Sequence, residues 1–406
     1  MPAISGSTVR AARERFDDPD IVQRTPIEYS RSLSDLASAE IHLKMEHLQR
    51  TGSFKTRGAY NKLQDVAARD DITEVVAASA GNHAQGVALA AAKTGVPATI
   101  VMPTTAPQTK IDATRGYGAD VVLEGLTFGQ AVDHARTLSD RSGVEFVHAF
   151  DDPLIVAGQG TLGLEVLEDV PDIDTIVVPI GGGGLIGGIS AVLAEERPDV
   201  RIVGVQAEDA STVPDSLDKG YPLPTDDVDT IADGIATGSI SELTFSLIRE
   251  HVDEIITVSE EELASGVVFL LERAKQLVEG AGAASVAALL SGRLDVSGET
   301  VVPVLSGGNL DMSMLQTLLT HELTARKQQI RLRVRIDDGP GKLADISDRI
   351  AGLDANIRTV HHYRADNSLS VGEAFLVFLV ETSGESHAAK IIETIEEQGY
   401  DVDLVN

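Results

Sequence analysis

Short runs of apolar residues alternate with helical patterns through most of this 406-residue chain. The runs are VVAA (75–78), ATIVM (98–102), VVL (121–123), TIVVPI (175–180) and RIVGVQA (201–207). The stretches between them are long enough for helices, such as residues 57–68 and the alanine-rich residues 83–93, which are followed by Gly95. Strands that are apolar on both faces belong in a parallel sheet that helices cover on both sides. The alternation therefore predicts an α/β fold with doubly wound sheets.

The pattern changes near residue 325, and helical residues run to about Gln328. IRLRVRI (330–336) alternates strictly between apolar and polar residues, as a strand with one exposed face does. Further helical and strand patterns follow at residues 342–353, 355–364, 373–381, 386–398 and 401–405. The order βαββαβ predicts a separate domain of ferredoxin-like topology. We therefore expect two domains, residues 1–328 and residues 329–406.

The chain is strongly acidic, with 33 Lys and Arg against 63 Asp and Glu and a formal net charge of −30. The acids are spread along the chain, and such a surface repels nucleic acid and anionic membranes, so we expect neither as a partner. Dispersed acids also keep a protein hydrated in concentrated salt. A halophilic source is the preferred explanation, and a merely acidic cytosolic enzyme is the alternative.

The absence of cysteine excludes disulfides, thiolate metal sites and cysteine nucleophiles. The charged N-terminal segment lacks the apolar core of a signal peptide. No uncharged apolar run reaches the roughly 18 residues that a membrane span needs. We expect a cytoplasmic protein.

The sequence PIGGGGLIGGI (179–189) follows a strand pattern and opens a helix pattern. Successive glycines leave N–H groups free to converge on an anion, and a helix N-terminus adds partial positive charge. Gly182, Gly184 and Gly187 also match G-x-G-x-x-G, so an NAD-dependent oxidoreductase stays an alternative. However, the motif lies in mid-chain, and Gln206 stands where a ribose-binding acid is expected. A phosphate cradle is therefore the preferred interpretation.

Two more strand-then-glycine turns occur, SAGNHAQG (79–86) and VLSGGN (304–309). Taken alone, the first is either a capped helix start or a carboxylate site, and the second is only a turn. However, ligands of doubly wound sheets bind at the carboxyl ends of the strands. Lys55, in TGSFKTRGA (51–59), is either a hydrated surface lysine or a nucleophile. A lysine, a phosphate cradle, a carboxylate-binding loop and a hydroxyl donor at one edge suggest pyridoxal phosphate.

These four motifs, in this order, resemble the fold type II pyridoxal-phosphate enzymes, specifically the threonine and serine dehydratases, over residues 20 to about 322. The resemblance implies two interwoven α/β subdomains with tryptophan synthase β-like doubly wound sheets, and pyridoxal 5′-phosphate as cofactor. The tail, with DGPGKLADI (338–346) and GLDANI (352–357), resembles an ACT domain, an amino-acid-sensing module.

The resemblance also implies roles for particular residues. Lys55 forms the Schiff base with the cofactor and removes the Cα proton, Phe54 packs near the cofactor, and Asn82 hydrogen-bonds its ring hydroxyl. Ser306 faces the pyridine nitrogen, and a neutral serine there favours prompt loss of a β-hydroxyl. The phosphate is expected on the backbone N–H groups of Gly181, Gly182, Gly183, Gly184 and Leu185. The substrate carboxylate is expected near Ser79, Ala80, Gly81, Asn82 and His83.

The expected activity is a threonine ammonia-lyase that converts L-threonine to 2-oxobutanoate and ammonia, with L-serine as a slower substrate. An L-serine ammonia-lyase or hydroxyaspartate dehydratase of the same fold is the nearest alternative, and a non-catalytic amino-acid sensor is a remote one. Serine racemases carry a serine where this chain has Ala80, so racemisation is not expected. Relatives that hold a divalent cation have acids at the positions of Gln206 and Thr212, so we expect no metal site.

The ACT resemblance implies allosteric control, with isoleucine or valine as the effector and a role in isoleucine biosynthesis. Effectors of ACT domains usually bind where two copies meet. The expected effector residues are Asp338, Gly341, Leu343, Asn356 and Ile357. A homotetramer or homodimer is the expected assembly.

Overall fold

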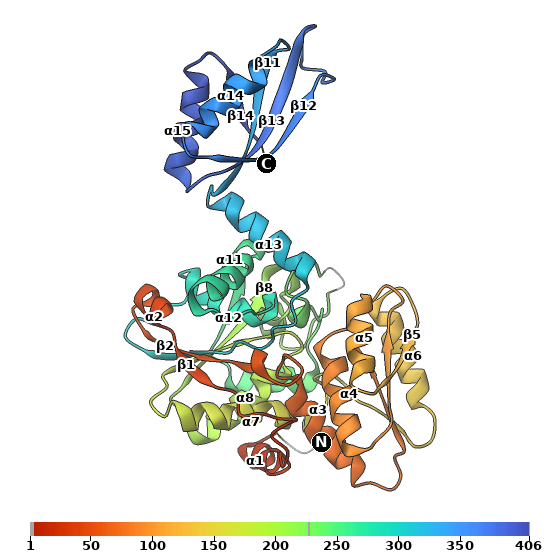
Figure 1. Ribbon diagram of the computed structural model, residues 1–406. Coiled ribbons are helices and arrows are strands. Elements are labelled where there is room, and N and C mark those ends of the chain that lie inside the picture. Colours follow the sequence, from red (N-terminus) through yellow and green to blue (C-terminus); the bar gives the residue numbers. More distant parts are fainter. Residues whose placement is uncertain (1–3, 226–227, 406) are drawn as a thin grey trace. The chain divides into compact units, whose positions relative to one another are not determined.

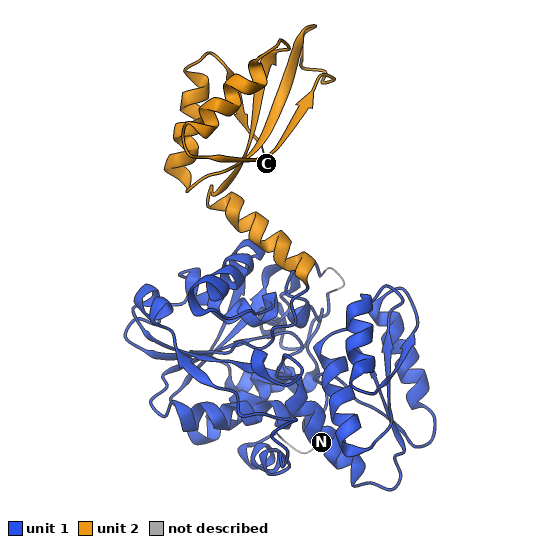
Figure 2. Ribbon diagram, viewed as in Figure 1, with its two compact units in different colours: residues 1–311 blue, residues 312–406 orange. Residues whose placement is uncertain are grey.

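The structure, a computed structural model, describes residues 4–225 and 228–405 and divides into two compact units, residues 1–311 and 312–406 (Figure 2). The division therefore lies after Asp311, whereas the sequence pattern placed it after residue 328. The difference is helix α13 (Met312–Ala325), which contacts β11 (Gln329–Asp337) of the second unit. A helical pattern does not reveal which neighbour the helix packs against, so the strand at residue 330 had marked the boundary.

The first unit contains two largely parallel sheets, which confirms the predicted doubly wound α/β fold (Figure 1). The large sheet has the order β1-β2-β10-β7-β8-β9, and only β1 runs antiparallel to its neighbour. Its strands are β1 (Ile27–Tyr29), β2 (Glu40–Lys44), β7 (Thr175–Pro179), β8 (Arg201–Ala207), β9 (Glu254–Val258) and β10 (Thr300–Pro303). The small sheet is parallel, in the order β5-β4-β3-β6: β3 (Glu74–Ala78), β4 (Ala98–Met102), β5 (Asp120–Leu123) and β6 (Val144–Phe146).

Helices cover both sheets. They are α1 (Gly6–Glu14), α2 (Arg31–Ala37), α3 (Lys55–Ala67), α4 (Asn82–Thr94), α5 (Gln108–Gly116), α6 (Phe128–Ser139), α7 (Pro153–Asp169), α8 (Gly184–Glu196), α9 (Val213–Lys219), α10 (Glu242–His251), α11 (Glu260–Phe269) and α12 (Gly280–Leu290). Single turns lie at Glu46–Leu48, Glu208–Ala210 and Asp233–Ile235, and a π-helical turn at Leu270–Ala274 extends α11. Several starts are set by local capping, as at α7, where Asp152 accepts from the N–H groups of Leu154 and Ile155. Among the described residues, no helix is long and apolar enough to cross a membrane.

The path of the chain joins the two sheets. The chain leaves the large sheet after β2, builds the small sheet, and returns at α7 (Figure 1). Helix α3 packs against α4 on one side and α7 on the other, so it stands where the two subdomains meet. Each sheet has an apolar core, exemplified by Val75 and Ile100 in the small sheet and by Ile176 and Ile189 in the large one.

The second unit has the predicted βαββαβ order and an antiparallel sheet, β12-β13-β11-β14, which confirms the ferredoxin-like topology. After β11 come α14 (Lys342–Ala351), β12 (Asn356–Tyr363), β13 (Glu373–Glu381), α15 (Glu385–Glu396) and β14 (Asp401–Leu404). Alternate residues of a strand face the same side, so Leu332 and Val334 pack in the core with Ile346 of α14 and Ile391 of α15.

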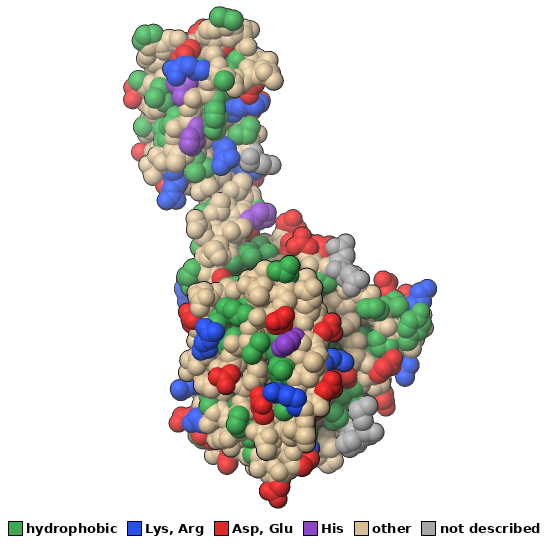
Figure 3. All heavy atoms as spheres, turned by 90° about the vertical axis from the view of Figure 1, so that its right-hand side faces the viewer, with side chains coloured by type: hydrophobic (Ala, Val, Ile, Leu, Met, Phe, Trp, Pro, Cys, Tyr) green, Lys and Arg blue, Asp and Glu red, His purple; other side chains and the backbone are tan. Residues whose placement is uncertain are grey.

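The acidic residues do not form a single patch on the visible surface. On the face in Figure 3, carboxylate side chains are dispersed among basic and neutral ones. Many lie in surface ion pairs, such as Arg10 with Glu196. Such exposed pairs contribute little stability.

Candidate active site

Four helix N-termini meet beside Lys55. Helix α3 begins at Lys55, α4 at Asn82, α8 at Gly184 and α12 at Gly280. The backbone N–H of Phe54 donates to the carbonyl of Ser306 (3.1 Å), and that of Glu279 donates to the carbonyl of Gly307 (3.1 Å). The first N–H groups of a helix have no intrahelical partner and carry partial positive charge, so this region attracts anions.

Lys55 differs from the two other lysines near the core. Its Nζ lies 3.5 Å from the carbonyl oxygen of Ala149 and 4.9 Å from the centre of the Phe54 ring. Lys44, by contrast, pairs with Glu165 at 2.5 Å, and Lys62 pairs with Glu145 and Asp152 at 2.5 and 2.8 Å. Burial lowers the pKa of Lys55 to about 8, opposed by the carboxylate of Glu279. A lysine of this kind supplies a neutral amine above a pH of about 8, well below the range of an ordinary lysine.

Asn82 lies in a chain of hydrogen bonds. Its Nδ2 donates to Glu279 Oε1 (2.7 Å), and its Oδ1 accepts from Asn309 Nδ2 (2.7 Å). Asn309 Nδ2 also donates to the carbonyl of Thr51 (2.7 Å). Burial raises the pKa of Glu279 to about 7, opposed by the hydrogen bond from Asn82. The site thus holds an acid and an amine whose pKa values lie close to neutrality.

The loop before α4 is internally bonded. Ser79 Oγ accepts from the N–H of Gly81 (3.1 Å), and His83 Nε2 lies 3.0 Å from the carbonyl oxygen of Val147. Burial, followed by the charge of Lys55, lowers the pKa of His83 to about 3, so its ring is neutral. Ala80 is partly buried against the core of the small sheet. The loop therefore offers backbone N–H groups, rather than a charged histidine, to a carboxylate.

Each glycine of the loop before α8 has a packing reason as well. A Cβ at Gly182 would lie 2.1 Å from the Phe150 ring, and one at Gly181 would lie 2.9 Å from the Ile235 backbone. Gly183 has φ +82°, in the left-handed region that favours glycine. Small residues are therefore required for the loop to pass between its neighbours. The same backbone opens α8, which is the arrangement expected of a phosphate cradle.

Two serines complete the site. Ser306 is buried after β10, and its Oγ donates to the carbonyl of Ala281 (3.3 Å). Ser53 is fully buried, and its Oγ has no hydrogen-bond partner among the described residues. A buried hydroxyl without a partner is uncommon and fits a site that receives a polar ligand. An amine, an anion cradle, an amide donor and a serine hydroxyl are the kinds of group that pyridoxal phosphate requires.

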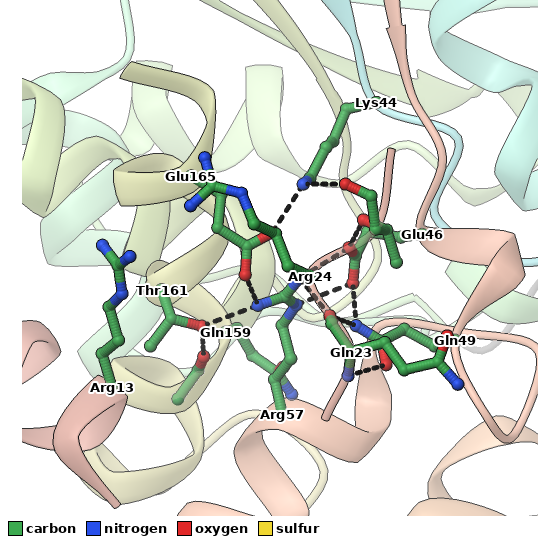
Figure 4. Close-up of polar contacts among 12 residues, drawn as sticks. Arg13, Gln23, Arg24, Lys44, Glu46, Gln49, Arg57, Gln159, Thr161 and Glu165 are labelled. Carbon is green, nitrogen blue, oxygen red and sulfur yellow. Dashed lines mark hydrogen bonds and ion pairs between the residues drawn. The ribbon is translucent and has the colours of Figure 1, made fainter. Parts of the chain in front are cut away.

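A buried network of ion pairs holds the first turn of α3 (Figure 4). Arg57, in the first turn of α3, donates to both carboxylate oxygens of Glu46 (2.8 Å each) and to both of Glu165 (2.7 and 2.9 Å). Lys44 donates to Glu165 and to the backbone carbonyl of Thr25. The side-chain hydroxyl of Thr25 donates to Glu46. Burial raises the pKa of Glu46, but the charge and hydrogen bonds of Arg57, the charge of Lys44 and the hydrogen bond from Thr25 together outweigh burial, so the pKa is lowered. The positive charges of Lys44 and Arg57 therefore balance the negative charges of Glu46 and Glu165. Arg57 stands two residues after Lys55 in the same helix.

Sequence reasoning missed three residues of the site: Phe150, Glu279 and Asn309. Glu279 precedes GAGA, a glycine-rich helix start like the one at Asn82, and this pattern could have found it. Asn309 lies within the VLSGGN motif, of which only Ser306 had received a role. Phe150 carries no signal in the sequence. Gln206 Oε1 accepts from the N–H groups at the start of α9 at 3.2 and 2.9 Å, so its side chain stabilises a turn.

Comparison with known proteins agrees with this geometry. Residues 19–307 match the family model for pyridoxal-phosphate dependent enzymes. The L-threonine ammonia-lyase of Thermotoga maritima is 45% identical over 386 residues, 95% of this chain and 96% of that protein. A threonine deaminase structure from Solanum lycopersicum has a TM-score of 0.73 and 36% identity over 79% of this chain and 90% of its own. Maize serine racemase has a TM-score of 0.74 and 31% identity, over 80% and 100% of the two chains. The NAD-dependent oxidoreductase alternative is therefore wrong, and the chain belongs to the pyridoxal-phosphate-dependent enzymes.

Proposed function

We propose that this protein is a threonine ammonia-lyase that converts L-threonine to 2-oxobutanoate and ammonia. The observation that carries the proposal is Lys55, an amine with a lowered pKa at the meeting point of four helix N-termini, which no carboxylate of the described residues contacts. The likeness to the Thermotoga maritima L-threonine ammonia-lyase supports the choice of substrate, since it extends over both units of the chain.

The residues that would hold the cofactor are Lys55 through its amine, Gly181–Leu185 through backbone N–H groups, Asn82 through its amide and Ser306 through its hydroxyl. Bound pyridoxal phosphate supplies an electron sink that stabilises negative charge at the substrate Cα. The start of α4 binds the substrate carboxylate through backbone N–H groups, which orients the Cα–H bond. Lys55, neutral above a pH of about 8, takes the Cα proton at Nζ. The β-hydroxyl then leaves, and hydrolysis of the released product yields the 2-oxo acid and ammonia.

The nearest competing function is a serine ammonia-lyase or serine racemase, because maize serine racemase shares the fold. Racemisation needs an acid on the face opposite Lys55, and Ala80 offers no hydroxyl there. The test is a panel of L-threonine, L-serine and L-3-hydroxyaspartate, with 2-oxo acid and D-serine measured together. The proposal requires the highest kcat/KM for L-threonine and no D-serine. Equal D-serine and pyruvate formation would refute it.

The second unit is proposed as an ACT domain that senses isoleucine or valine, which places the reaction in isoleucine biosynthesis. Asp338 lies at the turn before α14 and accepts from Arg364 (2.6 and 3.3 Å), Gly341 precedes α14 at φ +88°, and Leu343 is half exposed. Asn356 and Ile357 start β12 at the level of Gln329, because both Asn356 and Gln329 pair with Glu381. Nine residues of strand thus separate them from Asp338, roughly 30 Å. One effector site can therefore include both groups only if it forms between two copies, which fits a homodimer or homotetramer.

The dispersed acidic surface supports a halophilic origin. The net charge is −30, and like charges at low salt repel one another and weaken the folded state. Thermal unfolding in 0.1 M and 2 M KCl tests this. A melting temperature that rises by more than about 10 °C with salt agrees with the proposal, whereas no change favours an ordinary acidic enzyme.

A further inference from the structure

The chain Thr51–Asn309–Asn82–Glu279 begins and ends at groups with fixed hydrogen-bonding roles. The carbonyl of Thr51 only accepts, and the ionised carboxylate of Glu279 only accepts. Asn309 must therefore direct its Nδ2 toward Thr51, and Asn82 must direct its Nδ2 toward Glu279. The one remaining contact, Asn309 Nδ2 to Asn82 Oδ1, is consistent with both orientations. A rotation of either amide by 180° would therefore break a hydrogen bond, that of Asn309 with Thr51 or that of Asn82 with Glu279.

Two glycines make room for this chain. A Cβ at Gly52 would lie 2.4 Å from Asn309 Oδ1, and Gly52 has φ +75°. A Cβ at Gly307 would lie 2.3 Å from Glu279 Oε1 and 3.2 Å from Asn82 Nδ2. The polar chain is therefore built into the backbone that carries Lys55 and Ser306, and it could not form with larger residues at either position.

We propose that Asn309 and Glu279 are positioning residues that hold the Asn82 amide with its NH₂ group toward the cofactor. The NH₂ group carries two hydrogens, and Glu279 takes one of them. The second is left for the ring oxygen of pyridoxal phosphate, a phenolate that needs a donor. If the amide were reversed, its carbonyl oxygen would face the phenolate and repel it. The inference rests on the role proposed above for Asn82.

Protonation of Glu279 loosens this restraint. A protonated carboxyl can donate as well as accept, so it no longer requires the NH₂ group of Asn82. Burial raises the pKa of Glu279 to about 7, and the other charged groups that act at this place are Lys55, Lys110 and Asp233. Lys110 forms ion pairs with Asp233 (3.3 Å) and Asp311 (3.6 Å), and its charge lowers the pKa of Glu279 whereas that of Asp233 raises it. The orientation of Asn82 is therefore most strongly held above pH 7.

The first test is Asn309→Asp, which keeps the shape of the side chain and removes both donors. We expect the apparent Kd for pyridoxal phosphate to rise at least tenfold, and the absorbance of the bound cofactor to shift to shorter wavelength as the phenolate loses its donor. The matched control is Asn61→Asp in α3. It likewise removes an amide donor to a backbone carbonyl, which in this case is that of Leu154. Near-ultraviolet circular dichroism verifies the fold of each variant.

The second test separates this inference from the role of Asn82 itself. In an Asn82→Ala background, Asn309→Asp should change the cofactor Kd less than twofold, because Asn309 acts through Asn82. Unchanged Kd and absorbance in Asn82→Ala alone would refute the role of Asn82. A strong effect of Asn82→Ala together with an unchanged Asn309→Asp protein would refute only the positioning proposal.

Glu279→Gln provides an independent measurement if Asn309→Asp does not fold. Glutamine can donate or accept, so it permits both orientations of Asn82. The absorbance of bound cofactor should differ from that of the unmodified protein above pH 7, and the difference should shrink below pH 7, where Glu279 is already protonated. A difference that does not depend on pH overturns the proposal.

Discussion

Arg57 and Glu46 share two hydrogen bonds of 2.8 Å, from Nε to Oε2 and from Nη2 to Oε1, and neither side chain is exposed. The same guanidinium bonds both oxygens of Glu165. Only a planar group with several donors can serve two carboxylates at once. The first turn of α3, and with it Lys55, is therefore tied to α7 and to the turn after β2.

Arg57→Lys tests this arrangement at constant charge. Lysine has no planar fork, so at least one carboxylate loses a partner, and we expect the free energy of unfolding to fall by about 2–3 kcal/mol. Urea denaturation measures it. The control is Arg10→Lys in the half-exposed pair with Glu196, where a change below about 0.5 kcal/mol is expected. Equal effects at both positions would contradict the distinction.

Lys55→Met should abolish turnover and covalent attachment of the cofactor, yet stabilise the apoprotein. Because the folded-state pKa of about 8 lies below the ordinary 10.5, the charged amine costs free energy. This cost is fully present below pH 8 and vanishes as the pH rises to 10.5. The increase in stability caused by Lys55→Met should therefore be largest below pH 8 and disappear near pH 10.5. Lys62→Met should instead destabilise by about 3 kcal/mol, since Asp152 loses its partner. Thermal melts of both variants from pH 6 to 10 decide the matter.

Cofactor attachment to the apoprotein should depend on pH through the same group. Only the neutral amine of Lys55 is a nucleophile, so the rate should rise about tenfold per pH unit below a pH of 8 and level off above it. Stopped-flow absorbance after mixing with pyridoxal phosphate follows the reaction. A midpoint near 10.5 would mean that the amine is not desolvated.

Gly182→Ala should displace Phe150, because the new Cβ would lie 2.1 Å from its ring. We expect at least tenfold weaker binding of pyridoxal phosphate and partial recovery when Phe150→Ala is added. Gly116→Ala is the control, since a Cβ at Gly116, at the end of α5, meets nothing within 4 Å. Equilibrium dialysis gives the affinities, and a Gly182→Ala protein that binds normally would show that the loop can shift without loss.

A mixing experiment tests whether the effector site forms between two copies. Asp338→Ala and Asn356→Ala should each remove the response to isoleucine while turnover of L-threonine persists. Co-expressed and purified as a mixed oligomer, the two variants should regain part of the response, because some interfaces then carry one intact group from each copy. Asp366→Ala, another exposed acid of the second unit, is the control. A response retained in both single variants would place the effector elsewhere.

The regular elements were largely predictable, and the polar contacts were not. The bounds of β4, β8 and β13 agree with the sequence pattern because their apolar or alternating residues repeat with the period of the strand. Strands β1 and β6 have three residues each, too few for a period to appear. Lys55 stood out through its surrounding motif, whereas the contacts of Glu279 and Asn309 with Asn82 span some 200 residues of chain. Local sequence cannot encode such contacts.

The pairing of β2 with β10 sets an order for synthesis of the protein. Ile41 pairs with Val301, so β2 leaves the ribosome roughly 260 residues before its neighbour, on the order of tens of seconds earlier. The small sheet is contiguous in sequence, from β3 to β6, and can pair as it emerges. The nascent chain therefore carries a finished small subdomain and an open edge at β2 for much of its synthesis. The hydrogen bond from the Phe54 N–H to the Ser306 carbonyl, beside Lys55, can form only when synthesis nears the end of the first unit.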